Sequence, residues 1–380
     1  MALSRRAGEA PTLSIFEKLT RVNWGLLLLL TIIAGIGFAM LYSAGNGNWD
    51  PWASRQMVRY GIGFAGLLIV ALIDIRFWIR YAYFFYLGAL ILLGVVEGMG
   101  AIGMGARRWI DLGIIQLQPS EVMKIALILA LARYFHAVPL DEIGRIRVVL
   151  FPLLLLVMPV VLVLRQPDLG TAIVMVLITG VVIFAAGIRI WKFALAAGVA
   201  LAAIPIAWPM LHEYQRQRVL TFIDPSRDPL GAGYHITQSK IALGSGGTVG
   251  RGFMQGTQSH LSFLPERHTD FIFTMLAEEF GLVGSLGLLA IYAIIILYAI
   301  AIAVQSKNQF GRLLVIGVIA TFSIYTTINV AMVTGLVPVV GVPLPFVSYG
   351  GTSLLTLMAG FGLIICVNVH RDTQIRRRSG

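Results

Sequence analysis

The chain has 380 residues, of which 58% are hydrophobic and only 12% are charged. A water-soluble globule of this length would need a more polar surface, so the composition indicates a protein whose main solvent is lipid. The formal net charge of +11 would suit a nucleic-acid partner. Most of the basic residues, however, lie in short segments between apolar runs, where they orient a membrane protein. We therefore expect a membrane protein that has no nucleic-acid partner.

Runs of about 17 to 25 apolar residues, the length that a helix needs to cross the hydrocarbon core, recur along the chain. They predict ten spans, at residues 24–43, 58–75, 78–97, 119–136, 148–164, 169–188, 190–210, 272–304, 312–335 and 352–369. The first run follows a basic flank but is long enough to span, so we interpret it as an uncleaved helix. The predicted fold class is all-α, a polytopic membrane helical bundle in which residues 1–380 form a single integral membrane domain.

The orientation of the bundle follows from its lysines and arginines. Most of them fall on the side that carries both termini, which is typical of the cytoplasmic face. We therefore expect both termini in the cytoplasm. Residues 211–270 then form one large extracytoplasmic loop, and a loop of this length is usually associated with function or disorder. Its aromatic and isoleucine content argues against disorder.

Two glycine-rich segments match phosphate-binding motifs only in part. Gly98–Gly103 fits G-x-G-x-x-G, but it follows a membrane span and lacks the strand, helix and ribose-binding acid of a dinucleotide fold. Gly244–Gly250 lacks the Gly-Lys-Ser/Thr ending of a P-loop. We expect a flexible re-entrant turn in the second segment and no nucleotide at either. No His or Cys spacing in the chain is typical of a zinc site.

Four ionisable residues crowd the junction between the long loop and the eighth span. Glu266, Arg267, His268 and Asp270 lie within five positions at a membrane surface. This density indicates a functional site, because ionisable groups are costly there without a purpose. The alternative is structural: Thr269 or Asp270 can cap the following helix, and an acid in a first helical turn is stabilised by the helix dipole.

A second polar group surrounds the start of the fourth span. Glu121 and Lys124 are three residues apart and share a helix face, so they can neutralise each other as an ion pair. The other interpretation is that Lys124, or Arg108 before the span, faces a polar cavity and meets an anion. Two segments with proline breaks, Arg165–Thr171 and Pro343–Ser353, are expected to line a cavity, because irregular backbone at membrane depth must be covered by protein or water.

With these residues assembled, the chain resembles the SEDS family of cell-wall proteins (shape, elongation, division and sporulation) over nearly its whole length. Seven ordered segments carry the resemblance: Arg107–Trp109, Gln118–Glu121, Gln166–Thr171, Arg218–Pro225, Gly233–Ser239, Pro265–Phe273 and Pro343–Ser353. Pro265–His268, Gly341–Pro345 and the short N-terminal tail are more similar to the elongation branch of the family than to its division branch.

The resemblance implies a peptidoglycan glycosyltransferase of the bacterial cytoplasmic (inner) membrane. Members of this family polymerise lipid II, the lipid-linked disaccharide pentapeptide, into glycan strands on the outer membrane face during cell elongation. They work with a class B penicillin-binding protein, which supplies transpeptidation, and with the elongation machinery. The essential acid of the family's His-Thr-Asp-Phe motif corresponds to Asp270. The tryptophan after the paired arginines corresponds to Trp109, and the Glu and Lys of the fourth span correspond to Glu121 and Lys124.

The implied reaction needs a base near the acceptor hydroxyl and positive charge on the departing pyrophosphate. We expect Asp270 to be the catalytic base that deprotonates the 4-hydroxyl of the acceptor. The expected substrate-binding residues are Arg108, Trp109, Glu121, Lys124, Arg218, Lys240, Arg267 and His268. A divalent cation, magnesium or manganese, that bridges Asp270 and the pyrophosphate is an open alternative, and no other cofactor is expected.

Two further functions fit the same features. A transporter that flips lipid II would also place polar residues inside a helical bundle. It would be expected to keep its charged site near the midplane of the membrane, whereas the acid and the arginines here lie at the outer junction. A scaffold that only recruits the cell-wall machinery needs no ionisable cluster. The enzyme is therefore the favoured interpretation.

Overall fold

The computed structural model describes residues 14–99, 101–103, 106–111, 116–139, 141–210, 213–228, 231–260 and 267–375. Each of the ten predicted spans coincides with a helix. These helices are α2 (Trp24–Ala44), α3 (Trp52–Leu72), α4 (Ile75–Met99), α5 (Pro119–Ala137), α6 (Ile146–Arg165), α7 (Leu169–Ala185), α8 (Ile190–Ala207), α12 (Ile272–Gln305), α13 (Gln309–Val333) and α14 (Gly351–Val369). The bounds differ by a few residues, and α3 differs most, since it begins six residues before the predicted span.

Within the described residues, seven of these helices are long and apolar enough to cross a membrane. Of the other three, α7 and α8 are apolar but shorter, and α5 carries Glu121, Lys124 and Arg133. The predicted fold class, a polytopic helical membrane bundle, is confirmed. Most residues of α5 are buried, because this helix is packed against α4, α6, α7, α13 and α14. Protein, and not lipid, therefore surrounds the charged residues near its start.

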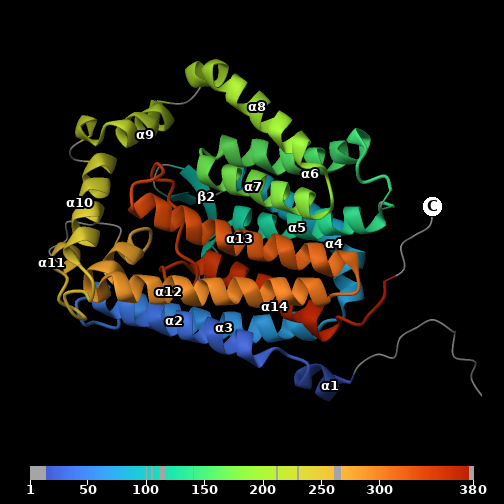
Figure 1. Ribbon diagram of the computed structural model, residues 1–380, viewed down its shortest axis with the longest axis horizontal. Helices are drawn as coiled ribbons and strands as arrows, with labels where there is room; N and C mark the ends of the chain where they lie inside the picture. The colour runs from blue at the N-terminus through green and yellow to red at the C-terminus, as the bar shows by residue number, and fades with distance from the viewer. Residues whose placement is uncertain are drawn as a thin grey trace, which may run out of the picture.

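The two ends of the bundle differ (Figure 1). The short helices α9 (Glu213–Ile223), α10 (Ala232–Ser245) and α11 (Thr257–His260) gather at one end, which we call the loop end. Helix α1 (Ile15–Thr20) and the end of α14 lie at the opposite end, which we call the terminal end. The first and last described helices, α1 and α14, thus both reach the terminal end of the bundle. The described parts of the long loop are largely helical.

A small antiparallel sheet, which the sequence did not indicate, lies between α4 and α5. Its strands are β1 (Ala101–Gly103), β2 (Ala106–Asp111) and β3 (Gln116–Leu117), in that order across the sheet. Ile110 pairs with Leu117, and Asp111 pairs with Gln116. The Gly98–Gly103 motif thus leads into an antiparallel strand, which is a different context from the parallel βαβ unit that binds dinucleotides.

The second glycine-rich segment, Gly244–Gly250, leads into a turn that hydrogen-bonds to α12 at a point where this helix is interrupted. Gly281 has a left-handed, non-helical conformation (φ 65°, ψ −160°) that interrupts this helix. The turn after α10 supplies backbone partners to the groups that the break leaves unpaired. The four bonds run from Arg251 and Gly252 to the carbonyls of Glu278 and Glu279, and from Leu282 and Val283 to the carbonyls of Gly247 and Thr248 (each 3.0 Å). A Cβ on Gly250 would lie 2.1 Å from the Glu279 carbonyl oxygen, so this close crossing requires glycine.

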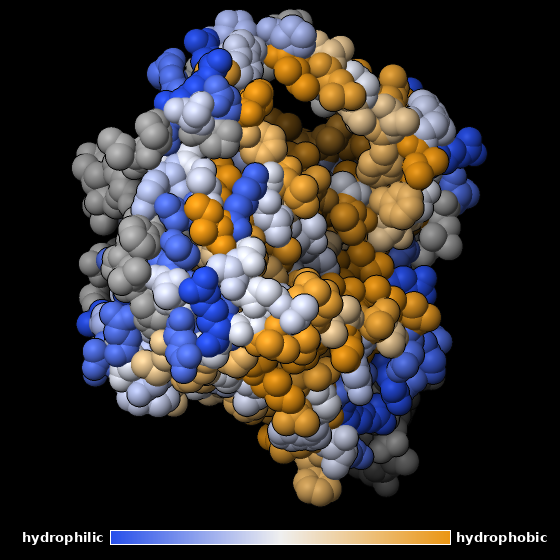
Figure 2. All heavy atoms as spheres, turned by 60° about the vertical axis from the view of Figure 1, so that its left-hand side comes forward, coloured by the Kyte–Doolittle hydropathy of each residue, from blue (hydrophilic) through white to orange (hydrophobic). Residues whose placement is uncertain are grey.

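Helix α8 stands away from the rest of the bundle. Its apolar side chains are largely exposed, including Ile190, Leu195, Val199 and Leu201. Figure 2 shows a hollow beneath the arch at the top of the molecule, where α8 lies in Figure 1, and hydrophobic side chains line this hollow. The bundle therefore presents apolar surface in a concavity as well as on its outer faces.

Candidate active site

Asp270 lies in a turn of residues 267–271 that leads directly into α12 at the loop end. Its side chain is partly buried. The N-cap residue of α12 is Phe271, and no side-chain hydrogen bond caps this helix. Neither Thr269 nor Asp270, the two candidates of the structural alternative, is therefore the N-cap residue of α12. Glu266, which belongs to the same predicted cluster, lies outside the described residues.

Three successive carbonyls of this turn are held by other segments of the chain. The His268 carbonyl accepts from the Tyr349 amide (2.8 Å), and the Thr269 carbonyl accepts from the Ser348 hydroxyl (2.6 Å). The Asp270 carbonyl accepts from the side-chain amide of Asn329 on α13 (2.9 Å). We call these bonds the carbonyl clamp. Because the clamp fixes the backbone on both sides of the Asp270 Cα, it limits the directions in which the carboxylate can point.

The Pro343–Ser353 segment, predicted to line a cavity, supplies two of the three donors of the clamp. Gln56 on α3 holds this segment in turn, since its amide nitrogen donates to the Ser348 carbonyl (3.0 Å) and its amide oxygen accepts from the Gly350 amide (3.4 Å). The Asn329 amide also donates to the Val342 carbonyl (2.7 Å). The irregular backbone is thus satisfied by amide side chains that reach out of apolar helices.

Aromatic groups enclose the other side of the turn. The His268 ring stacks on Trp52, with ring centroids 4.4 Å apart and an interplanar angle of 11°. The Arg59 guanidinium carbon lies 4.8 Å from the centroid of the Tyr349 ring. A Cβ built on Gly341 would lie 3.4 Å from Oδ2 of Asp270, so this glycine, whose φ is +78°, borders the carboxylate. His268 therefore serves packing through its ring as well as the clamp through its carbonyl.

Four residues that support the turn were not predicted from the sequence: Trp52, Gln56, Arg59 and Asn329. A signal existed for Gln56 and Asn329, because an isolated amide inside an apolar span is costly and needs a partner. Their partners are backbone carbonyls of remote loops, which the sequence does not reveal.

Glu121 and Lys124 form an ion pair inside the bundle. Lys124 Nζ lies 2.6 Å from Glu121 Oε1, and the side chains are 1% and 7% exposed. The Tyr325 hydroxyl donates to the same Glu121 oxygen (2.9 Å), and Lys124 Nζ lies 4.2 Å from the centroid of the Tyr325 ring. The ion-pair interpretation is confirmed. Because so little of Lys124 is exposed, its ammonium meets an anion only if the pair opens.

Arg108, on β2, holds the turn between α6 and α7. Its Nε donates to the Gln166 carbonyl (2.9 Å) and its Nη2 donates to the Pro167 carbonyl (2.6 Å). The Gln166 side chain extends this link to the Leu93 carbonyl on α4 (2.9 Å). Asp168 caps α7 through the Thr171 amide (3.1 Å). The Arg165–Thr171 segment is therefore a joint between three helices and the sheet. Trp109, the next residue of β2, is partly exposed.

The remaining predicted cations are distributed over the loop end. Arg218 on α9 and Lys240 on α10 are exposed. The hydroxyls of Ser239 and Thr274, which lie 2.7 Å apart, join α10 to the start of α12. Lys240 follows Ser239 in α10, so it too belongs to the part of α10 that lies next to the start of α12. Arg267 is partly buried beside Asp270, and burial lowers the pKa of its guanidinium. It stays charged at neutral pH, because the ordinary pKa of arginine is so high.

The described residues contain no group of three His, Cys, Asp or Glu side chains that could hold a metal ion. A divalent cation at Asp270 would thus take most of its ligands from substrate and water, as Mg²⁺ commonly does at phosphate-binding sites. The structure therefore leaves the predicted divalent cation as an alternative.

A sequence model of the FtsW/RodA/SpoVE proteins, described as "Cell cycle protein", matches residues 18–373 of this chain. The chain belongs to this family. It is 45% identical to peptidoglycan glycosyltransferase MrdB of Escherichia coli K12 over 369 residues, which cover 96% of the chain and 98% of that protein. The family is the one that the seven motifs indicated.

Solved structures of the family share the fold. A chain of a peptidoglycan synthase complex that coordinates polymerization and crosslinking superposes with a TM-score of 0.81 at 35% identity, covering 93% of this chain and 99% of that one. The crystal structure of the Thermus thermophilus rod shape determining protein RodA superposes with a TM-score of 0.70 at 30% identity, covering 93% and 98%. The chain therefore shares its helical arrangement with a chain of a peptidoglycan synthase complex and with RodA.

The Glu121–Lys124 pair leads to a prediction about stability. In Lys124→Met, the Glu121 carboxylate stays buried without its counter-charge, which should destabilise the bundle by about 3–5 kcal/mol. The matched double variant, Glu121→Gln with Lys124→Met, removes both charges and should recover most of this loss. The thermal unfolding midpoint of the purified proteins in detergent measures both effects. Equal losses in the single and double variants would show that the pair contributes packing only.

Proposed function

We propose that this chain polymerises lipid II into glycan strands on the outer face of the cytoplasmic membrane, with Asp270 as its catalytic base. The enzyme class is that of its 45% identical relative, a peptidoglycan glycosyltransferase. The observation that carries the assignment of Asp270 is the carbonyl clamp, which holds this acid in place at the loop end of the bundle, remote from α1.

The reaction transfers a sugar from a polyprenyl-pyrophosphate donor to an acceptor hydroxyl. Asp270 accepts the proton of the 4-hydroxyl as the new glycosidic bond forms, and the bond to pyrophosphate breaks. Cations on the departing pyrophosphate stabilise the charge that develops there. Arg218, Lys240 and Arg267 are proposed for this role, because they lie at the same end of the bundle as Asp270.

The other expected substrate contacts follow from their places in the fold. Trp109 is partly exposed on β2 and is proposed to face the sugar of the substrate. Glu121 acts through Lys124, which it holds, and His268 acts through the turn that contains Asp270. A magnesium or manganese ion shared by Asp270 and the pyrophosphate would neutralise the same developing charge.

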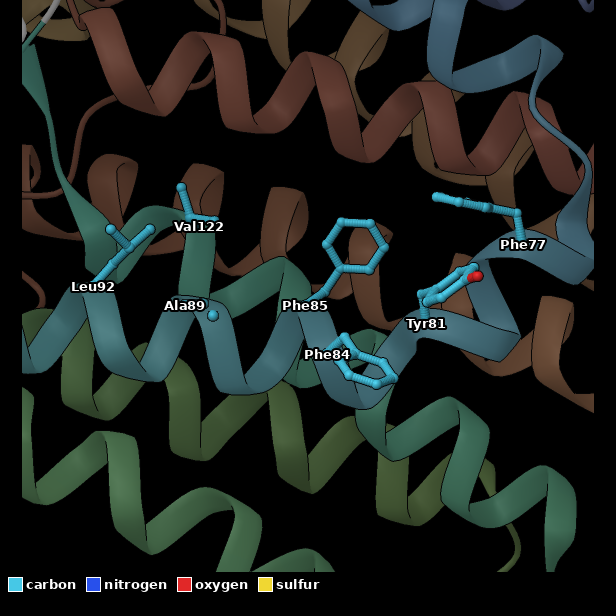
Figure 3. Close-up of a pocket in the computed structure, with 8 residues that line it drawn as sticks. Phe77, Tyr81, Phe84, Phe85, Ala89, Leu92 and Val122 are labelled. Carbon is cyan, nitrogen blue, oxygen red and sulfur yellow. The ribbon is translucent and has the colours of Figure 1, made fainter.

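An apolar groove on the side of the bundle suits the polyprenyl tail. It has a volume of about 430 Å³ and is lined by one face of α4 together with Val122 of α5 (Figure 3). Phe77, Tyr81, Phe84 and Phe85 project along this face, and Leu92 lies toward its other end. Val122 is adjacent in the chain to Glu121, so the groove approaches the buried ion pair. We assign this groove to the polyprenyl chain of lipid II.

The placement in the membrane is part of the same proposal. Both termini lie in the cytoplasm, and residues 211–270 face outward, within a single integral membrane domain of residues 1–380. We place the chain in the bacterial inner membrane beside a class B penicillin-binding protein, since a homologous chain occurs in a synthase complex that couples polymerization to crosslinking. The elongation machinery is its expected context.

The base role predicts that Asp270→Asn abolishes polymerisation. The asparagine keeps the size of the side chain but cannot accept the proton at neutral pH, so the rate should fall at least about 10²–10⁴-fold. Gel analysis of glycan formed from labelled lipid II by the chain with its penicillin-binding partner measures this rate. The exposed Glu213→Gln on α9 is the matched control and should keep full activity. Equal polymer from Asp270→Asn would remove Asp270 from the chemistry, and absence of polymer from the wild type would favour the flippase.

The carbonyl clamp predicts that Asn329→Leu lowers kcat more than it changes KM. This variant keeps the side-chain volume but leaves the Asp270 and Val342 carbonyls without their amide donor, and a displacement of about 1 Å at a reacting group can cost about 10²-fold in rate. Steady-state kinetics with lipid II measure kcat and KM. Ser323→Ala on the same helix removes a hydroxyl that bonds only to its own helix and should leave both constants unchanged. A pure rise in KM would contradict the positioning role.

The groove predicts that Gly88→Trp on α4 weakens capture of lipid II. The indole would fill the groove, since no atom lies within 4 Å of a Cβ built on Gly88. KM should rise about tenfold, which corresponds to about 1.4 kcal/mol of binding. The rise should vanish with a short-chain substrate analogue. Gly94→Trp, on another face of the same helix, is the control. Equal effects with long and short tails would exclude this groove as the tail site.

A further inference from the structure

A second cavity lies at the terminal end, remote from Asp270. It has a volume of about 360 Å³ and is formed by the start of α2, the end of α12 and the end of α14. Its polar lining consists of Asn23, Gln305, Asn368 and Arg371. Its apolar lining consists of Val22, Trp24, Tyr298, Ala301 and Ile302. The proposed polymerase reaction uses none of these residues.

The cations around this cavity outnumber the acids that they contact. Asp372 accepts from Lys307 (2.7 Å) and also lies 3.8 Å from Arg21. Arg371 donates to the neutral side-chain oxygen of Gln305 (3.1 Å). The pKa of Asp372 is lowered, mainly by its hydrogen bond to Lys307 and the charge of Lys307, with smaller contributions from Arg371 and Arg21. One carboxylate thus serves three cations, which leaves positive charge for an anion from outside.

A nearby acid does not remove this surplus. Glu17 lies close enough to Arg21 for the charge to lower its pKa, but its main partner is Ser14, with which it closes a capping box at the start of α1. The Ser14 amide donates to this carboxylate at 2.8 Å. Glu17 therefore offsets part of the charge of Arg21 and contacts no residue of the cavity.

The cavity passes from polar to apolar along α12. Gln305 and Tyr298 are seven residues apart on this helix, which is about 10 Å along its axis. Trp24 and Tyr298, which are 54% and 41% exposed, lie at the apolar side, and such aromatic rings favour the membrane interface. A soluble anion would use only the polar side, whereas an amphiphile with an anionic head and an apolar body would use both.

We propose that this cavity binds a phospholipid with an anionic headgroup, whose phosphate contacts Arg371 and whose acyl chains lie along Trp24 and Tyr298. The Gln305 and Asn23 amide groups add uncharged donors beside the phosphate. Basic pockets between transmembrane helices bind such headgroups by combining charge with apolar contact. The site is independent of the active site, because it lies at the opposite end of the bundle.

Native mass spectrometry of the purified full-length chain tests this site. The protein in detergent is mixed with equal amounts of phosphatidylglycerol and phosphatidylcholine, and the ratio of the two bound lipids is measured. The wild type should retain phosphatidylglycerol in preference. Arg371→Gln should lower the ratio about fivefold, the effect of one basic residue near a membrane surface. Arg371→Lys should keep most of the preference, which separates loss of charge from loss of folding.

A matched arginine controls for general surface charge. Arg147 at the start of α6 is exposed at the same end of the bundle but lies outside the cavity, so Arg147→Gln should leave the ratio unchanged. Equal losses in Arg147→Gln and Arg371→Gln would overturn the proposal, as would a wild type without preference. Displacement of the lipid by excess glycerol phosphate would also overturn it, because the cavity would then be a site for a small soluble anion.

Discussion

The carbonyl clamp is the constraint on which the candidate active site depends. Backbone carbonyls that are covered by protein need hydrogen-bond donors, so a turn packed against buried side chains must find these donors in the chain itself. Here the donors come from Asn329, Ser348 and the Tyr349 amide, and Gln56 holds the segment that carries two of them. The solution to this backbone problem also orients Asp270. The same few hydrogen bonds therefore satisfy the backbone of the turn and hold the proposed catalytic base.

The buried charged side chains are also paired within the protein. Lys124 and Glu121 neutralise each other, and Glu121 also accepts a hydrogen bond from the Tyr325 hydroxyl. Arg108 donates to the carbonyls of the α6–α7 turn. An isolated charge at these positions would be costly, so each is matched before a substrate arrives. The cations proposed to bind the pyrophosphate, Arg218, Lys240 and Arg267, lie instead at the loop end with Asp270.

The helices could be predicted from the sequence, but several of their bounds and connections could not. Apolar runs locate all ten, yet the start of α3 was placed too late, because Arg55, Gln56 and Arg59 make its first turns polar. Two of these residues, Gln56 and Arg59, contact the segment that supports the candidate active site. The sheet could not be predicted because its strands are only two to six residues long, which is too short for a pattern of alternating hydrophobicity to identify them. Hydrophobicity predicts the segments that face lipid, whereas the start of α3 and the sheet are determined by contacts with other parts of the protein.

Asp270 could be placed in a site from its charged neighbours and its family motif, whereas Asn329 could not. Its two partners are main-chain carbonyls 59 and 13 residues away, and every residue type has a carbonyl, so no pattern of side chains points to them. The same holds for the glycine turn: Gly250 is required because the Glu279 carbonyl crosses it, not because of any neighbour in sequence. Motifs indicate which groups can react. The positions of the reactive groups depend on other residues, the polar side chains and glycines that hold irregular backbone. In a membrane bundle these supporting residues are needed because every buried carbonyl requires a hydrogen-bond donor.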